Sequence, residues 1–220
     1  MSEIELLYES GACLVVRKPA GLATQAPAQF DSLEKRIRAW LAQREPRAEY
    51  VYLAVPHRLD RPVSGAMLFA TRRRAAFKIS RQFERREIKK IYWACVEGRV
   101  EPSEGTWTDH LRKIYGHPRA EVVDPEAAGA QLAVLRYRTL GMTPWGSWLE
   151  IELETGRTHQ IRVQAASRGH AVLGDAFYGG SAPFGPQHHD ERLRAIALHG
   201  RSLEFTHPHT GQRVTVTAEP

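Results

Sequence analysis

The chain has 220 residues, and its 31 lysines and arginines against 25 aspartates and glutamates give a net charge of +6. Hydrophobic residues make up 42% of it, a composition typical of a globular domain that excludes low-complexity and collagen-like classes. No apolar run approaches the roughly 18 residues of a membrane span, and the two cysteines form no CxxC pair, which excludes a zinc ribbon. No secretory leader pattern opens the chain and two cysteines give no disulfide framework, so we expect a cytoplasmic protein.

The first part of the chain predicts short strands interrupted by two helices. Apolar positions at helical spacing predict one helix over 32–44, with Ser32 or Asp31 as its N-cap. A second helix is expected from a Thr71 cap to about Glu87. Strands are expected over 4–8, 12–16, 65–70 and 88–97, with a turn at 18–21 and a short apolar run at 51–55.

The second part is richer in strands. A helix is expected over 158–168, ended by Gly169, and 117–129 has the composition of a loop. Strands are expected over 106–114, 132–140, 148–154, 202–206 and 213–217. Because most strands follow one another through short turns and few helices intervene, the pattern predicts an α+β fold with a mainly antiparallel sheet.

The positive charge is concentrated between residues 72 and 90. Nine basic residues there are opposed only by Glu84 and Glu87, so this stretch carries +7 and the rest of the chain about −1. Such a local field attracts polyanions, nucleic acid first, although a solvated helix face would show the same run. The basic residues are Arg72, Arg73, Arg74, Lys78, Arg81, Arg85, Arg86, Lys89 and Lys90.

The first candidate for chemistry is the polar segment His57-Arg-Leu-Asp-Arg61, which lies between two apolar runs. Reactive groups are usually carried on loops of this kind, and Asp60 could serve as a nucleophile, an acid or a base. The structural alternative is that Asp60 pairs with Arg58 or Arg61 and only ties down a turn.

The second candidate is the segment 155–162, which reads as a strand-to-helix junction. His159 and Arg162 are three residues apart and would share a helix face near its N-terminus. Backbone N–H groups there, together with Arg157 and Arg162, would attract an anion. An ordinary helix cap with exposed arginines is the alternative.

Three other signals are weaker. Tyr92 lies on a predicted strand beside the basic helix and could stack on a base or exchange a proton, or be a core tyrosine. Asp175 could be catalytic, but a carboxylate in such a loop more often bonds a turn backbone. The ten histidines lack metal-ligand spacing, and neither a phosphate-binding glycine motif nor a GxSxG elbow is present.

Five of these blocks occur in a fixed order: 14–22, then 57–60 with Ser64-Gly65, 89–92, 156–162, and Gly174-Asp175 with Tyr178-Gly179 before 197–199. In this order they resemble the RluA-type family of RNA pseudouridine synthases. The blocks look like that family's opening strand and turn, its catalytic motif, its tyrosine motif and its arginine motif. The match spans most of the chain.

The resemblance implies a catalytic domain with a mixed, mainly antiparallel sheet and a central cleft. It implies isomerisation of uridine to pseudouridine in RNA without cofactor or metal. We expect a single domain over 1–220 without an S4-like module before it, a tRNA or rRNA substrate, and a monomer. Asp60 would be the essential carboxylate, and Arg162 would pair with it. Tyr92 would pack against the target base and is a candidate for proton abstraction, and Arg58 would fill the space left by the flipped nucleotide.

Further RNA contacts are expected around this site and along the basic helix. They are His57, Arg58, Arg61, Arg72, Arg73, Arg74, Lys78, Lys89, Lys90, Arg157 and His159. In the reaction, the N1–C1′ bond must break and C5 must bond to C1′. The carboxylate could attack C1′ or assist elimination and re-addition, and the sequence does not choose between these routes.

The RNA substrate stays open, because the loop 183–192 has no counterpart that we can name and Pro62 is only weakly typical of the tRNA-acting subgroup. One alternative function is an RNA-binding or RNA-chaperone protein with little turnover, which would not require Asp60, Tyr92 and Arg162 together. The other is a metal-dependent nuclease that uses the histidines with Asp60 or Asp175, and the poor ligand spacing disfavours it.

Overall fold

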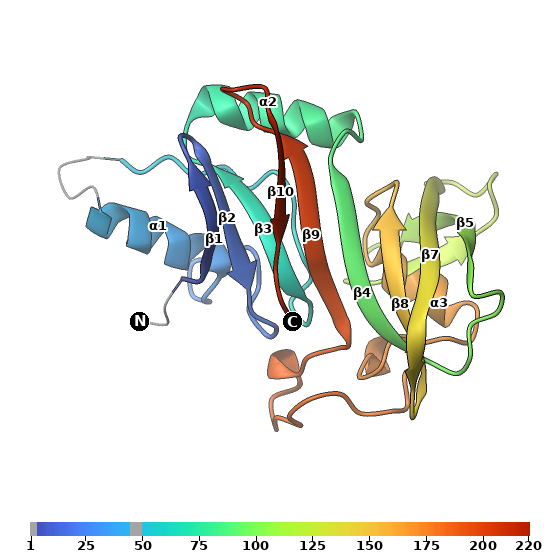
Figure 1. The fold of residues 1–220 in the computed structure, drawn as a ribbon. Coiled ribbons are helices and arrows are strands. Elements are labelled where there is room, and N and C mark those ends of the chain that lie inside the picture. Colours follow the sequence, from blue (N-terminus) through green and yellow to red (C-terminus); the bar gives the residue numbers. More distant parts are fainter. Residues whose placement is uncertain (1–3, 45–49) are drawn as a thin grey trace. The chain divides into compact units, whose positions relative to one another are not determined.

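The computed structural model describes residues 4–44 and 50–220 (Figure 1). The chain divides into two compact units, the first formed by Met1–Lys89 with Gly200–Pro220 and the second by Lys90–His199. Each unit has its own antiparallel strand pairs and its own helices, which confirms the α+β class. That the whole of 1–220 acts as a single catalytic domain stays a prediction.

The first unit is a small sheet with two helices. Its strands lie in the order β1-β2-β3-β9, and β10 pairs with β9. The β1–β2, β2–β3 and β9–β10 pairs are antiparallel. The elements are β1 (Leu6–Ser10), β2 (Cys13–Lys18), α1 (Leu33–Arg44), β3 (Ser64–Ala70), α2 (Arg73–Glu84), β9 (Leu198–Thr206, from Gly200 onward in this unit) and β10 (Arg213–Thr217).

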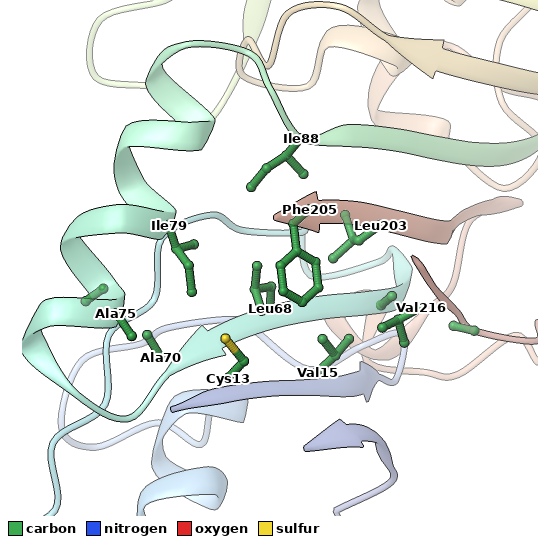
Figure 2. Packing of buried hydrophobic residues seen from close by; sticks show 13 residues of the cluster. Cys13, Val15, Leu68, Ala70, Ala75, Ile79, Ile88, Leu203, Phe205 and Val216 are labelled. Atoms are coloured by element: carbon green, nitrogen blue, oxygen red, sulfur yellow. The ribbon is translucent and has the colours of Figure 1, made fainter. Parts of the chain in front are cut away.

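The core of this unit lies between α2 and the strands. Ala75, Ala76 and Ile79 form the inner stripe of α2 and pack against β2, β3, β9 and β10. Figure 2 shows Ala75 and Ile79 facing these strands. The strands contribute Cys13, Val15, Leu68, Ala70, Leu203, Phe205 and Val216 to this cluster. Successive residues of β2 and β3 are buried, except for the half-buried Arg17 and Ser64, so both faces of these strands are covered.

The second unit is a five-stranded antiparallel sheet in the order β4-β8-β7-β5-β6. Its elements are β4 (Lys89–Glu97), β5 (Glu104–Lys113), β6 (Ala120–Val123), β7 (Gln131–Thr143), β8 (Gly146–Leu153), α3 (Gln160–Ala166) and the short 3₁₀ turns η1 (Ala176–Tyr178) and η2 (Glu191–Leu193). Gln164 of α3 donates to the Trp107 carbonyl of β5, and the Arg168 guanidinium lies over the Trp107 ring at 5.1 Å. These contacts hold α3 against the sheet.

Several predicted boundaries are wrong for local reasons. Thr71 does not cap α2: Arg72 precedes the helix, without a side-chain cap bond. The helix ends at Glu84 rather than Glu87, because Arg86 takes the left-handed conformation with a φ of 60° and Glu87 N–H closes back on the Gln82 carbonyl at 2.9 Å.

The other two corrections concern the second unit. The segment expected to be a loop over 117–129 contains β6, which pairs with β5. The helix expected over 158–168 begins only at Gln160, because His159 has a left-handed φ of 53°.

In the first unit, the structure decides between the two N-cap candidates for α1. The Lys35 N–H lies 3.3 Å from the Ser32 hydroxyl, so Ser32 is the cap. In the described chain, the 51–55 run forms only one β-bridge, at Ala54.

Candidate active site

Asp60 lies on the loop that leads into β3, and the main chain on its N-terminal side is held by Thr24. The Thr24 hydroxyl donates to the Leu59 carbonyl at 2.8 Å and accepts the Leu59 N–H at 3.2 Å. The Leu59 side chain is buried. On the other side, the Val63 N–H donates to the Asp60 carbonyl at 3.1 Å. The backbone of Asp60 is therefore fixed from both directions.

A buried lysine completes this support. The Lys18 ammonium is wholly inaccessible to solvent and donates to the carbonyls of Leu22 at 2.7 Å, Pro19 at 2.9 Å and Arg61 at 3.2 Å. The Arg61 carbonyl also accepts the Gly21 N–H at 2.8 Å. Burial lowers the pKa of Lys18 to about 7, with the nearby Asp60 carboxylate acting against the shift and the Arg61 charge adding to it.

Lys18 is thus a group of the site that the sequence analysis treated only as part of a turn. Its position at the end of a largely buried strand, after four buried residues and Arg17 and before Pro19, is the signal that points to it. An amine with a pKa near 7 changes its charge beside Asp60 in the neutral pH range.

His57 anchors the start of the loop. Its Nε2 accepts the Leu68 N–H of β3 at 2.9 Å, and its ring stacks on Phe83 of α2 with centroids 4.7 Å apart. Because Nε2 accepts, the neutral imidazole carries its proton on Nδ1. Arg58 is exposed, and Arg61 is half-buried.

The backbone conformation at position 65 explains why a glycine follows Ser64. Its φ is +134°, and a Cβ there would overlap the main chain of Gly200 on β9. Only glycine permits this close approach of backbone to backbone. It places the end of the Asp60 loop directly against the C-terminal part of the first unit.

In the second unit, Tyr92 lies on β4 opposite Ile151 of β8 and is 9% exposed. Strand alternation puts it on the same buried face as Ala94 and Val96. Trp93 lies on the other face, where its indole N–H donates to Glu150 at 3.3 Å. Tyr92 is therefore held in a well-packed position on the sheet.

Arg162 of α3 is held by a buried carboxylate. Its Nε and Nη2 donate to Asp175 Oδ2 and Oδ1 at 2.7 and 2.8 Å, a bidentate pair in which the side chains are 6% and 1% exposed. The guanidinium also lies over the ring of Tyr178 at 5.0 Å. The sequence analysis expected Asp60 as the partner of Arg162, and that pairing stays a prediction. The ion pair with Asp175 is one that it missed.

Asp175 has two structural functions. Its main-chain carbonyl accepts the N–H groups of Tyr178 at 3.0 Å and Gly180 at 2.9 Å. Its carboxylate, which we expected to bond the turn backbone, makes no cap bond there and binds Arg162 instead. That expectation is wrong because a buried arginine, distant in sequence, competes for the carboxylate.

His159 and Tyr178 form a further contact next to Arg162. Tyr178 Oη accepts the Ala120 N–H at 3.0 Å and is hydrogen-bonded to His159 Nδ1 at 2.8 Å. Burial is the main cause that raises the pKa of Tyr178, which keeps the phenol protonated. Among the expected RNA contacts, His159 is thus also part of the scaffold, and Arg157 Nε donates to the Leu132 carbonyl at 2.9 Å.

The remaining expected RNA contacts lie on or near α2. Arg72, Arg73 and Arg74 are exposed at its start, and Lys78 is exposed and donates to the Pro208 carbonyl at 2.7 Å. Lys89 is exposed and Lys90 is half-buried. Within the residues that the structure describes, no three histidine, cysteine or acidic side chains gather as metal ligands, and no helix has the length and apolarity to cross a membrane.

Comparison with known proteins decides the family. The family model described as RNA pseudouridylate synthase matches residues 12–167, which include Asp60, Tyr92 and Arg162. The chain belongs to this family. It is a family of isomerases that act on RNA, and the order of the motifs in the sequence predicted it.

Similar proteins match nearly the whole of this chain in sequence, and a solved structure matches it in fold. An uncharacterized RNA pseudouridine synthase of Bacillus subtilis is 33% identical over 98% of this chain and 68% of its own length. Ribosomal large subunit pseudouridine synthase D of Pseudomonas aeruginosa is 35% identical over 96% of this chain and 67% of its own. The solved structure of human RNA pseudouridylate synthase domain containing 4 has a TM-score of 0.77 at 22% identity and covers 98% of this chain and 88% of that one. The chain spans 58 to 68% of the bacterial relatives' length.

Proposed function

We propose that this pseudouridine synthase family member converts uridine to pseudouridine in ribosomal RNA of the large subunit, with Asp60 as the essential carboxylate. The observation that carries the proposal is the support of the Asp60 loop, in which Thr24 and Lys18 hold the main chain on both sides of one acidic residue. Main-chain support of this kind orients a carboxylate for chemistry.

The roles of the other groups follow from the reaction. Breaking the N1–C1′ bond frees the uracil, which turns so that C5 bonds to C1′, and the C5 proton must then leave. Tyr92 would pack against the base and take part in that proton transfer, and Arg162 would hold Asp60 ionised. The target must first leave its stack, at a cost of about a few kcal/mol, and Arg58 would occupy the space it vacates.

The choice of RNA rests on the relatives. Two of the similar bacterial proteins, from Pseudomonas aeruginosa and Nitrosomonas europaea, are named for the large ribosomal subunit. We therefore place ribosomal RNA ahead of transfer RNA. We further propose that the enzyme works in the cytoplasm as a monomer, without metal or cofactor.

The test is release of tritium from C5-tritiated RNA. The protein is incubated separately with unmodified ribosomal RNA and transfer RNA, and tritium in water is counted. We expect release from ribosomal RNA that Asp60→Asn abolishes, while RNA affinity falls less than tenfold, equivalent to about 1.4 kcal/mol. Asp31→Asn is the matched control, because Asp31 is an exposed carboxylate of the same unit that pairs with Arg36.

Each outcome has a distinct meaning. Release from transfer RNA alone would correct the substrate and keep the reaction. An active Asp60→Asn enzyme would overturn the assignment of the carboxylate. Tight RNA binding without release from either pool would favour the binding-only function.

A further inference from the structure

The outer face of α2 carries an exposed phenylalanine. Phe77 is 64% exposed, although the opposite stripe of the same helix, Ala75, Ala76 and Ile79, is buried in the core. Single exposed apolar side chains are common and need no explanation alone. The surroundings of Phe77 are what distinguish it.

Basic residues flank Phe77 along α2. Arg73 and Arg81 are four residues before and after it, Arg74 is three before, and Lys78 is adjacent. The three arginines, at spacings of three and four, are neighbours of Phe77 on the helix face, and Lys78 follows it in the chain. The Arg81 guanidinium lies over the Phe77 ring at 5.7 Å from its centroid.

The chain does little to balance these charges. The first turn of α2 has no acidic residue, and within the described residues Arg73, Arg74 and Arg81 have no ion pair with a carboxylate. Arginines at the start of a helix also lie at the positive end of its dipole, where cations are unfavourable. An anion from outside would relieve both effects.

We infer that this face, formed by Arg73, Arg74, Phe77, Lys78 and Arg81, binds an unpaired nucleotide of the RNA substrate, with the base stacked on Phe77 and phosphates on the cations around it. The inference rests on the proposed function for the identity of the RNA. Basic grooves with an aromatic platform bind single strands without regard to sequence, because every base has a π-face. Because this kind of binding does not select a base, the face would hold an unpaired segment beside the target uridine. The target uridine itself would bind at the Asp60 site.

The test compares the RNA affinity of a variant that lacks the aromatic ring with that of a variant that lacks one positive charge. Binding of a single-stranded RNA of about 12 nucleotides is measured by fluorescence anisotropy across a salt series. We expect Phe77→Leu to weaken binding about tenfold without changing the slope of log affinity against log salt, and Phe77→Trp to retain binding. Arg74→Gln should instead reduce the slope by about 0.7.

The matched control is Trp145→Leu. Trp145 is 55% exposed on the turn between β7 and β8, and in the described chain no cation lies over its ring. We expect it to bind RNA as the unmodified protein does. Unfolding midpoints of all variants show whether each is folded, and exposed Phe77 should tolerate leucine.

Two results would overturn the inference. One is Phe77→Leu binding within twofold of the unmodified protein, which would leave a purely electrostatic surface. The other is Phe77-dependent binding to phosphatidylglycerol vesicles that exceeds binding to RNA, which would assign the face to a membrane surface.

The tritium assay separates this inference from the proposed function. Tritium release with no effect of Phe77→Leu on RNA affinity would contradict the stacking site and leave the proposed reaction standing. Phe77-dependent RNA binding without any release would support the stacking site and sink the proposed reaction.

Discussion

The Asp60 loop of the first unit is held through its main chain, whereas Arg162 of the second unit is held through its own side chain. Thr24 and Lys18 bind the carbonyls next to Asp60, and the bidentate partner of Arg162 is Asp175. The first arrangement fixes the main chain next to Asp60. The second makes the Arg162 side chain itself part of a buried polar pair, so we expect removal of that pair's carboxylate to cost stability.

The largest expected effect tests the side-chain support. Asp175→Leu would leave the Arg162 charge buried without its bidentate partner, and we expect a loss of about 3–5 kcal/mol in the free energy of unfolding. The measurement is urea denaturation. The double variant Arg162→Met with Asp175→Leu should recover most of this loss, because an apolar pair replaces an ion pair at little cost.

A cost below about 1 kcal/mol for Asp175→Leu would contradict this comparison. It would mean that Arg162 is held mainly by its other contacts, such as the ring of Tyr178.

The next effect tests whether the main-chain support responds to pH. Lys18 has a pKa of about 7 in the folded protein, against about 10.4 in an unfolded chain, so between these values the unfolded chain binds more protons. The free energy of unfolding should therefore rise with pH over this range, by up to about 4 kcal/mol from this group. Lys18→Met should lack that rise.

The measurement is urea denaturation of both proteins from pH 6 to pH 10. The difference between them isolates Lys18 from other groups that titrate in this window. Parallel pH profiles for the two proteins would show that the Lys18 ammonium is not held at its low pKa.

The smallest effect concerns Thr24. Thr24→Val keeps the shape of the side chain and removes both hydrogen bonds to Leu59. We expect a loss of about 1–3 kcal/mol, the cost of leaving buried main-chain groups unpaired, with a lower kcat on C5-tritiated RNA. Unchanged kcat in a destabilised but folded variant would show that Thr24 supports the fold without orienting Asp60.

Local pattern predicted most of the fold. Helical spacing in 32–44 and strand alternation in 88–97 correspond to α1 and β4. β6 was missed because Ala120–Val123 is only four residues long and includes Glu121, and its pairing with β5 makes it a strand. The ends of α2 and α3 depend on the left-handed conformations of Arg86 and His159, which neither propensity nor spacing predicts.

The site shows the same limit. The motif spacing identified Asp60, Tyr92 and Arg162 as candidates, since each lies in a short segment with its own signature. Lys18 and Asp175 were missed in these roles because their partners lie 43 and 13 residues away, and nothing local states that they meet. Tertiary contacts, not local pattern, assign these supporting groups.

The division of the chain has a consequence for how the protein is made. The first unit includes Gly200–Pro220, which supplies Leu203, Phe205 and Val216 to its core, but the ribosome reaches these residues only after the whole of Lys90–His199. At ordinary rates of synthesis that delay is roughly 5 to 20 s. During this delay, Val15, Leu68 and Ile79 of the first unit lack the core partners that Gly200–Pro220 supplies. The second unit, by contrast, already has all of its residues and can fold.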